Sequence, residues 1–204
     1  MTKKSPPPMT VAALILGIFT LSAYSQNGLE PPHVGNTSEV SGVYEDLMRK
    51  AKQGERLAQY TLGVMYDRGL GVLQDFQEAI RWYQAAAEQG HTTAQFSLGV
   101  MYAAGEGVTR NYEEAFRWYR AVGEQGHGHA QNNLGDMYNK GQGVVQDYVL
   151  AHMWFNLAVS NITDDYKDMA VKNRDLVAEK MTSDQVAEAL RLAREWKPKG
   201  SESP

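Results

Sequence analysis

A block of 36 residues recurs in this chain, and it constrains the fold more than any other feature. The copies begin at Ala58, Ala94 and Ala130. The first two read AQYTLGVMYDRGLGVLQDFQEAIRWYQAAAEQGH and AQFSLGVMYAAGEGVTRNYEEAFRWYRAVGEQGH, and the third begins AQNNLGDMYNKGQGVVQD. A single unit of this size cannot bury its own apolar face, so the copies must stack on one another. The spacing predicts repeats at 58–93, 94–129 and 130–162, preceded by a half repeat at 43–57.

Each copy predicts two antiparallel helices. Ala58, Leu62 and Met65 fall at helical spacing and give the first helix one apolar stripe. The Gly69-x-Gly71 pair that follows is expected to end this helix, because glycine enters left-handed conformations without strain. A glycine also lies within the first helix of every copy, where it costs about 1 kcal/mol relative to alanine. Its recurrence opposite an alanine of the second helix predicts a close approach of the two backbones.

The second helix begins with a capping signal. Asp75 followed by Glu78 matches a capping box, and Asn111 with Glu114 repeats the pattern. A tryptophan then recurs at one register: Trp82, Trp118 and Trp154. We interpret these side chains as core anchors between neighbouring hairpins rather than as ligand-stacking groups.

After the third copy the pattern changes into two predicted capping helices over 163–197. The first is expected to start at Thr163 or Asp164 and to run to about Lys180. The second opens with the capping box Thr182–Gln185 and ends before Pro198. Atypical terminal units are what a stack of repeats requires at its end. Residues 198–204 are predicted to be a disordered tail.

The pattern A-x-x-x-L-G-x-x-Y-x-x-G-x-G-V, then Asp or Asn, then A-x-x-W-[YF], resembles the Sel-one-like repeat (SLR) family, a relative of the tetratricopeptide repeat. The resemblance covers about residues 43–196. It implies an all-α fold, a right-handed α-solenoid of stacked antiparallel helix pairs, used as a protein-interaction scaffold. It also implies roles such as host interaction, envelope maintenance or periplasmic signalling. A cysteine-rich subgroup is associated with β-lactam binding, but this chain has no cysteine, so that activity is not carried over.

The N-terminus carries the pattern of an export signal. Lys3 and Lys4 precede an apolar stretch from Val11 to Leu21, and small residues flank Tyr24 at the positions that a signal peptidase reads. The stretch has about half of the roughly 20 apolar residues that a membrane span needs. We therefore predict a signal peptide at 1–25, cleaved after Ser25, in preference to an uncleaved anchor.

This signal predicts a periplasmic or secreted protein with no stable membrane insertion after cleavage. Residues 26–40 contain Pro31-Pro32 without periodicity and are predicted to be a flexible linker. The helical repeat domain is expected at 41–197.

Composition excludes several classes of function. The chain has 204 residues with a net charge of −4 and a pI near 5.7, which is the wrong sign for a nucleic-acid partner. The absence of cysteine excludes disulfides and thiolate metal sites. The motifs Ser-x-x-Lys, Gly-x-Ser-x-Gly, His-Glu-x-x-His and Gly-x-x-x-x-Gly-Lys do not occur. We predict no catalytic residue and no cofactor.

Two histidine features have structural interpretations. His127-x-His129 is the nearest thing to a metal pair, but no third ligand lies nearby in sequence, so no metal site is predicted. His152 replaces Ile80 and Phe116 of the other copies. We interpret it as a partly exposed or hydrogen-bonded histidine rather than a catalytic base.

The candidate binding surface is the concave side, which the first helices line in stacked hairpins. By analogy with tetratricopeptide arrays, the candidate residues are Tyr60, Val64, Asp67, Arg68, Phe96, Val100, Asn132, Asp136, Asn139 and Lys140, with Ala103 and Ala104 at the same register. An apolar and aromatic portion runs into a polar one. Such a groove suits an extended or helical peptide with an apolar segment, although ordinary surface variation is an equal alternative.

These observations predict an exported, non-enzymatic adaptor that binds a protein or peptide in its concave groove. One alternative is an envelope hydrolase acting on cell-wall material or β-lactams. Another is a structural envelope component with no single ligand.

Overall fold

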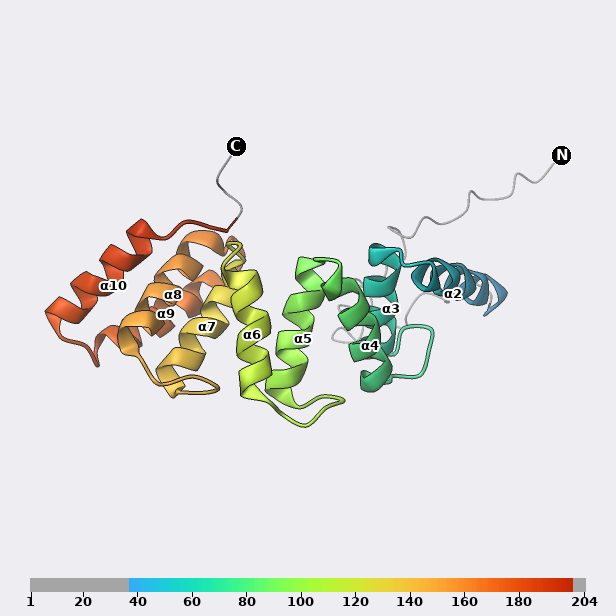
Figure 1. Ribbon diagram of the computed structural model, residues 1–204, viewed down its shortest axis with the longest axis horizontal. Coiled ribbons are helices and arrows are strands. Elements are labelled where there is room, and N and C mark those ends of the chain that lie inside the picture. Colours follow the sequence, from blue (N-terminus) through green and yellow to red (C-terminus); the bar gives the residue numbers. More distant parts are fainter. Residues whose placement is uncertain (1–36, 200–204) are drawn as a thin grey trace, which may run out of the picture. The chain divides into compact units, whose positions relative to one another are not determined.

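The computed structural model describes residues 37–199, and every regular element within them is a helix (Figure 1). The helices are α2 (Thr37–Lys52), α3 (Arg56–Arg68), α4 (Phe76–Glu88), α5 (Thr92–Ala104), α6 (Tyr112–Gly123), α7 (Gly128–Lys140), α8 (Tyr148–Asn161), α9 (Lys167–Ala178) and α10 (Ser183–Glu195). The predicted signal peptide and most of the predicted linker lie outside the described residues. The linker prediction ends too late, because α2 already begins at Thr37.

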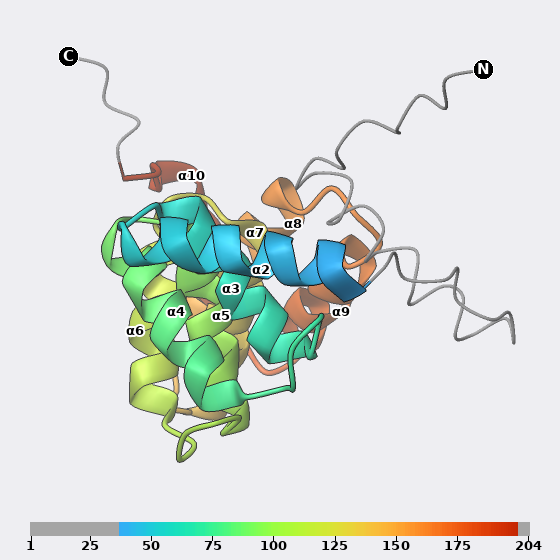
Figure 2. The same cartoon turned by 90° about the vertical axis from the view of Figure 1, so that its right-hand side faces the viewer.

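The chain divides into two units at Val43, and the packing that follows is that of residues 44–199. Each repeat is a helical hairpin: α3 packs on α4, α5 on α6 and α7 on α8. Successive hairpins meet through α4 and α5 and through α6 and α7. Viewed end-on, α4 and α6 form one layer beside α3 and α5 (Figure 2). The predicted all-α solenoid of stacked helix pairs is confirmed.

The core of each hairpin is an aromatic ring set against a glycine. A Cβ atom on Gly99 would lie 2.6 Å from the ring of Tyr119, and one on Gly135 would lie 2.7 Å from the ring of Phe155. Gly63 faces Tyr83 in the same way. The atoms nearest to these glycines therefore belong to an aromatic ring of the second helix, and not to the alanine that the sequence pattern pointed to. The helix glycine is needed because the ring occupies the space of its side chain.

The tryptophans are anchors between hairpins, but they are not the deepest residues. Trp118 packs against the buried cluster of α4 and α5. Trp154 belongs to the cluster shared with α6 and α7 and contacts Trp196, with the ring centroids 6.3 Å apart. In the first two repeats the residue that follows the tryptophan is the more buried one, with Tyr83 only 1% exposed.

The two glycines of each Gly-x-Gly turn have different tasks. The first caps the first helix in a left-handed conformation, as Gly105 does after α5 with φ of 80°. In the second and third repeats the second glycine also touches the preceding repeat. A Cβ on Gly107 would lie 2.6 Å from Cβ and 2.8 Å from the carbonyl oxygen of Phe76. The predicted turn is confirmed, and the sequence pattern did not indicate this second contact.

The second helices begin at the predicted N-cap residues. Only the bond from the cap side chain to the helix backbone forms, and the reciprocal bond from the glutamate side chain does not. The Asp75 carboxylate accepts hydrogen bonds from the backbone N–H groups of Gln77 and Glu78, at 2.9 and 3.1 Å. The N–H of Asp75 donates to the Tyr66 carbonyl oxygen, so the Glu78 side chain is free to pair with Arg81. The capping box predicted at Asp75 is therefore only half formed.

The same correction applies to the box predicted at Asn111. Its side chain accepts from the N–H of Glu114, whereas its own N–H donates to the Tyr102 carbonyl oxygen. At α10 the N–H of Thr182 donates to the side-chain oxygen of Gln185 and not to a carbonyl oxygen of a preceding turn. The N–H of Gln185 donates to the Thr182 hydroxyl, so the complete capping box forms.

At the C-terminal end, α9 and α10 both pack on α8. The first residue of α9 is Lys167, later than predicted, because Asp164 accepts a hydrogen bond from the Tyr166 N–H in a local turn. The tail boundary at 198 is also wrong. The N–H of Lys199 donates to the Glu124 carbonyl oxygen at 2.7 Å, and its ammonium pairs with the Glu124 carboxylate.

Candidate binding surface

The two aromatic residues predicted for the binding surface lie at the edge of the core. Tyr60 of α3 stacks on His91, with ring centroids 4.3 Å apart, and Phe96 of α5 stacks on His127 at 4.9 Å. Both are half-buried and pack against buried clusters. They therefore contribute to stability as well as to the surface.

The two histidines under these rings are helix caps, a role that the sequence analysis missed. The Nδ1 atom of His91 accepts the Ala94 N–H, and that of His127 accepts the Ala130 N–H, each at 3.2 Å. The signal was present, because each histidine precedes its helix by one residue and recurs with the repeat. His129 instead contacts Asp164 at 3.0 Å. No group of three His, Asp or Glu residues within 37–199 is arranged to hold a metal ion.

Part of the polar end of the predicted surface is covered by the chain itself. Asn132 is only 7% exposed, and its side-chain oxygen accepts a hydrogen bond from Asn173 of α9. The side-chain oxygen of Asn139 accepts one from the Lys180 ammonium at 3.1 Å. Asn132 and Asn139 therefore hold the cap in place, and they do not line a free groove as predicted.

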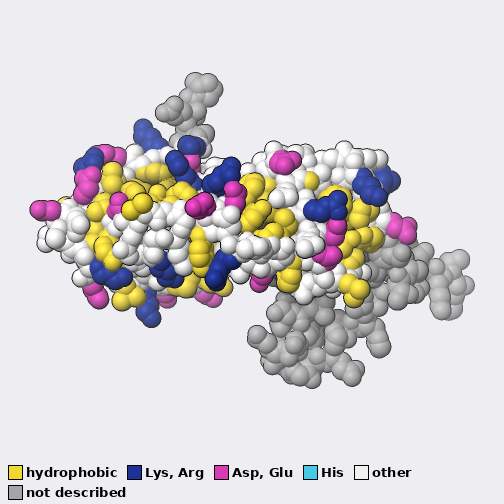
Figure 3. Space-filling view, turned by 60° about the horizontal axis from the view of Figure 1, so that its bottom comes forward, with side chains coloured by type: hydrophobic (Ala, Val, Ile, Leu, Met, Phe, Trp, Pro, Cys, Tyr) yellow, Lys and Arg dark blue, Asp and Glu magenta, His cyan; other side chains and the backbone are white. Residues whose placement is uncertain are grey.

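The other predicted residues lie in the open part of the surface. Val100 is 38% exposed, Val64 is half-buried, and Arg68 is exposed. The Asp67 carboxylate accepts a hydrogen bond from the Tyr83 hydroxyl at 3.2 Å. Asp136 and Lys140 form an exposed ion pair of 2.7 Å along α7. On the face drawn in Figure 3, acidic and basic side chains alternate with hydrophobic ones.

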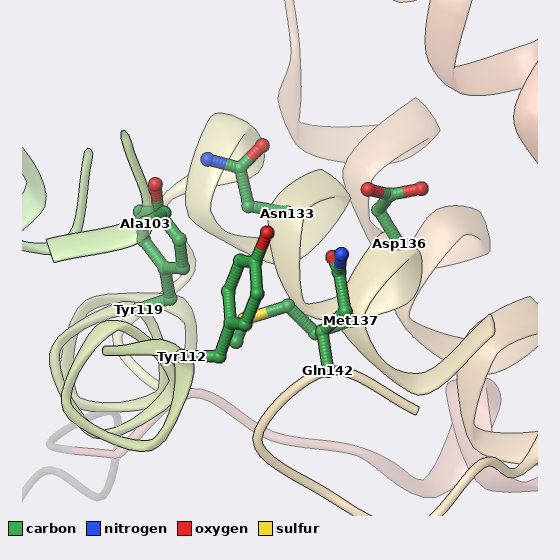
Figure 4. A pocket seen from close by; sticks show the side chains of 7 residues that line it. All are labelled: Ala103, Tyr112, Tyr119, Asn133, Asp136, Met137 and Gln142. Atoms are coloured by element: carbon green, nitrogen blue, oxygen red, sulfur yellow. The ribbon is translucent and has the colours of Figure 1, made fainter. Parts of the chain in front are cut away.

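A pocket of about 140 Å³ opens between the second and third repeats (Figure 4). Its lining residues are Ala103 of α5, Tyr112 and Tyr119 of α6, Asn133, Asp136 and Met137 of α7, and Gln142 of the following turn. Burial raises the pKa of the Tyr119 hydroxyl, which therefore stays neutral at physiological pH. The pocket thus combines two phenol groups, two amides and one carboxylate.

The pocket exists because one residue is small. At the position equivalent to Ala103, the first repeat has Asp67 and the third repeat has Asn139. Asp67 fills its place and bonds to Tyr83, and Asn139 bonds to Lys180. Alanine has no polar group to offer, so the space beside Tyr119 stays open. Comparison of the three copies position by position contained this signal, but only the packing shows that the space is a pocket.

His152 is buried, whereas the sequence predicted a partly exposed or hydrogen-bonded side chain. It is 4% exposed, and its Nδ1 atom is buried without a hydrogen-bond partner. Burial lowers its pKa, the nearby Arg174 lowers it further, and Asp175 opposes them.

Comparison with known sequences identifies the repeat. A sequence model of the Sel1 repeat matches residues 56–91, 92–127 and 128–161. The chain belongs to the Sel1 repeat family. Its matched units start two residues earlier than the predicted ones, at the residues where α3, α5 and α7 begin. Proteins built from Sel1 repeats generally mediate protein–protein interactions and are typically non-catalytic scaffolds.

Two solved Sel1-repeat structures are similar to this chain. One is a protective antigen present in uropathogenic Escherichia coli strains, described as having an SLR fold, with 30% identity and a TM-score of 0.67. The match covers 90% of this chain but 38% of the antigen, so this chain spans well under half of that relative. The other is a Sel1 repeat protein from Oxalobacter formigenes, with 40% identity and a TM-score of 0.56, covering 64% of this chain and 96% of that one. The comparison with curated proteins found no match.

None of the helices within residues 37–199 of this Sel1-repeat protein has the length and hydropathy of a membrane span.

Proposed function

We propose that this protein is an exported scaffold that holds a protein or peptide partner on the open surface of its first helices. The N-terminal signal pattern motivates the export, and the Sel1 repeats support the scaffold role. The observation that carries the site is the contrast between repeats. On the third repeat α9 covers Asn132, whereas α3 and α5 leave Val64 and Val100 accessible.

Chemical crosslinking in intact cells tests the scaffold role directly. We expect the wild-type protein to yield one recurring crosslinked partner, identified by mass spectrometry. Val100→Arg should abolish this crosslink, because a charge there disrupts apolar contact with the partner. The melting temperature should change little, since Val100 already contacts solvent.

Leu73→Arg is the matched control. Leu73 is 91% exposed but lies in the turn between α3 and α4, so the same change there should leave the crosslink intact. Equal loss in both variants, or in neither, would contradict the proposed surface. Export has its own test, because the mass of the purified mature protein should lack residues 1–25.

A further inference from the structure

The pocket beside Tyr119 has a counterpart in the third repeat that is already occupied. Tyr148 there stands at the register of Tyr112, and Asn139 at the register of Ala103. The ammonium of Lys180 donates to Asn139 at 3.1 Å and lies 5.3 Å from the centroid of the Tyr148 ring. The chain thus places one of its own lysine head groups against the equivalent tyrosine, in a cation–π contact with a polar acceptor beside it.

From this we propose that the pocket of the second repeat, lined by Tyr112, Tyr119 and Asp136, is a subsite for a lysine or arginine side chain of the partner. This rests on the proposed scaffold function and specifies the chemistry of what the scaffold holds. The second repeat supplies no lysine of its own at the place of Lys180, because α7 and not a capping helix follows α6. The cation that the chain itself places near the Tyr112 ring is Arg110, at 5.5 Å, and Arg110 is not among the residues that line the pocket.

The charge of the lining favours a cation. Asp136 is the only charged residue among the lining residues of this pocket. Its present partner Lys140 lies one turn away on the same helix, and both side chains are substantially exposed. Such a pair is weak in water, so a partner's ammonium or guanidinium can replace it. The hydroxyl oxygens of Tyr112 and Tyr119 add further hydrogen-bond acceptors.

The size of the pocket agrees with a single head group. A water molecule needs roughly 15 Å³ of such space, and the pocket offers about 140 Å³. It therefore accommodates several atoms, enough for the end of a long basic side chain but not for a folded segment.

One basic residue of the chain competes for the site. The Arg110 guanidinium lies 5.5 Å from the centroid of the Tyr112 ring. The other repeats have Gln74 and Gln146 at this register. Removing the charge of Arg110 should therefore strengthen binding of an external cation, and removing the charge of Asp136 should weaken it.

The test uses the full-length protein, ¹⁵N-labelled, and Nα-acetyl-lysine N-methylamide as the probe. We expect saturable amide shifts at Ala103, Asn133 and Gln142 on titration, weakened by added salt. The norleucine analogue has the same chain without the charge and should produce none. Asp136→Asn should weaken the dissociation constant at least fivefold, and Arg110→Gln should strengthen it about threefold. Circular dichroism and the melting temperature check that both variants remain folded.

The subsite is wrong if the norleucine analogue shifts the same amides, or if Asp136→Asn binds the lysine probe as well as the wild type does. It is also wrong if the crosslinked partner is captured equally by Asp136→Asn, in which case the scaffold function still stands. Saturable lysine binding at these amides supports the subsite even if crosslinking recovers no partner, a result that would count against the scaffold function alone.

Discussion

At the scale of single residues, the surroundings of a glycine decide why that glycine is needed. Gly90 and Gly107 have nearly the same backbone conformation, with φ of 78° and 71°. They differ in surroundings, since a Cβ on Gly90 would meet nothing within 4 Å, whereas one on Gly107 would meet the backbone of Phe76. Both glycines recur with the sequence repeat, so the sequence does not separate them. Only the packing distinguishes a glycine that forms a turn from one that also contacts the neighbouring repeat.

This pair gives a matched prediction. Gly90→Ala and Gly107→Ala both place alanine in the left-handed region, at a cost of about 1–2 kcal/mol. Gly107→Ala also forces the second repeat away from Phe76, so its free energy of unfolding should fall by about 2 kcal/mol more. Urea unfolding followed by circular dichroism measures the difference. Equal losses would show that Gly107 is needed for its conformation alone.

At the scale of helices, the turn before each second helix decides how that helix is capped. The carbonyl oxygens of Tyr66 and Tyr102 accept the N–H of the cap residue. A reciprocal bond from Glu78 or Glu114 is therefore unnecessary, and both glutamates pair with an arginine one turn later. The sequence pattern of a capping box predicts the cap correctly and its second half incorrectly, because the competing carbonyl is distant in sequence.

We expect Asp75→Ala to lower the free energy of unfolding by about 1 kcal/mol, since two backbone N–H groups lose their acceptor. Glu78→Ala should cost about 0.5 kcal/mol or less, as expected for an exposed ion pair near a helix start. Thermal unfolding of the two variants compares them. A loss for Glu78→Ala as large as that for Asp75→Ala would mean that the complete box forms in solution.

At the scale of the whole molecule, the histidines couple the stability of the stack to pH. Burial is the main cause that lowers the pKa of His91, His127 and His152, with further lowering by Arg56, His129 and Arg174 respectively. A histidine whose pKa is lower in the folded state than in the unfolded one binds fewer protons when folded. The stability that these residues contribute is therefore present above the unfolded pKa of 6.5 and is lost as the pH falls below it.

The melting temperature should accordingly fall between pH 7.5 and pH 5. His152→Phe, which introduces the residue of the second repeat at this register, removes a buried ring nitrogen without a partner. We expect this variant to be more stable than the wild type at pH 5 and to show a shallower dependence on pH. Calorimetry across this range measures both effects. An unchanged slope would assign the pH dependence to the two capping histidines.

The sequence by itself determined the helix pairs, their turns, the cap residues of the second helices and the family, because these depend on contacts within one repeat and on spacing that survives in the chain. Which glycine touches the preceding repeat, where α9 lies and why Asn132 is buried depend on neighbours outside the repeat, so only the tertiary structure decided them. The pocket is the clearest case. Ala103 is unremarkable in the sequence, and it leaves a space only because the helices around it hold Tyr112 and Tyr119 at a fixed distance from α7.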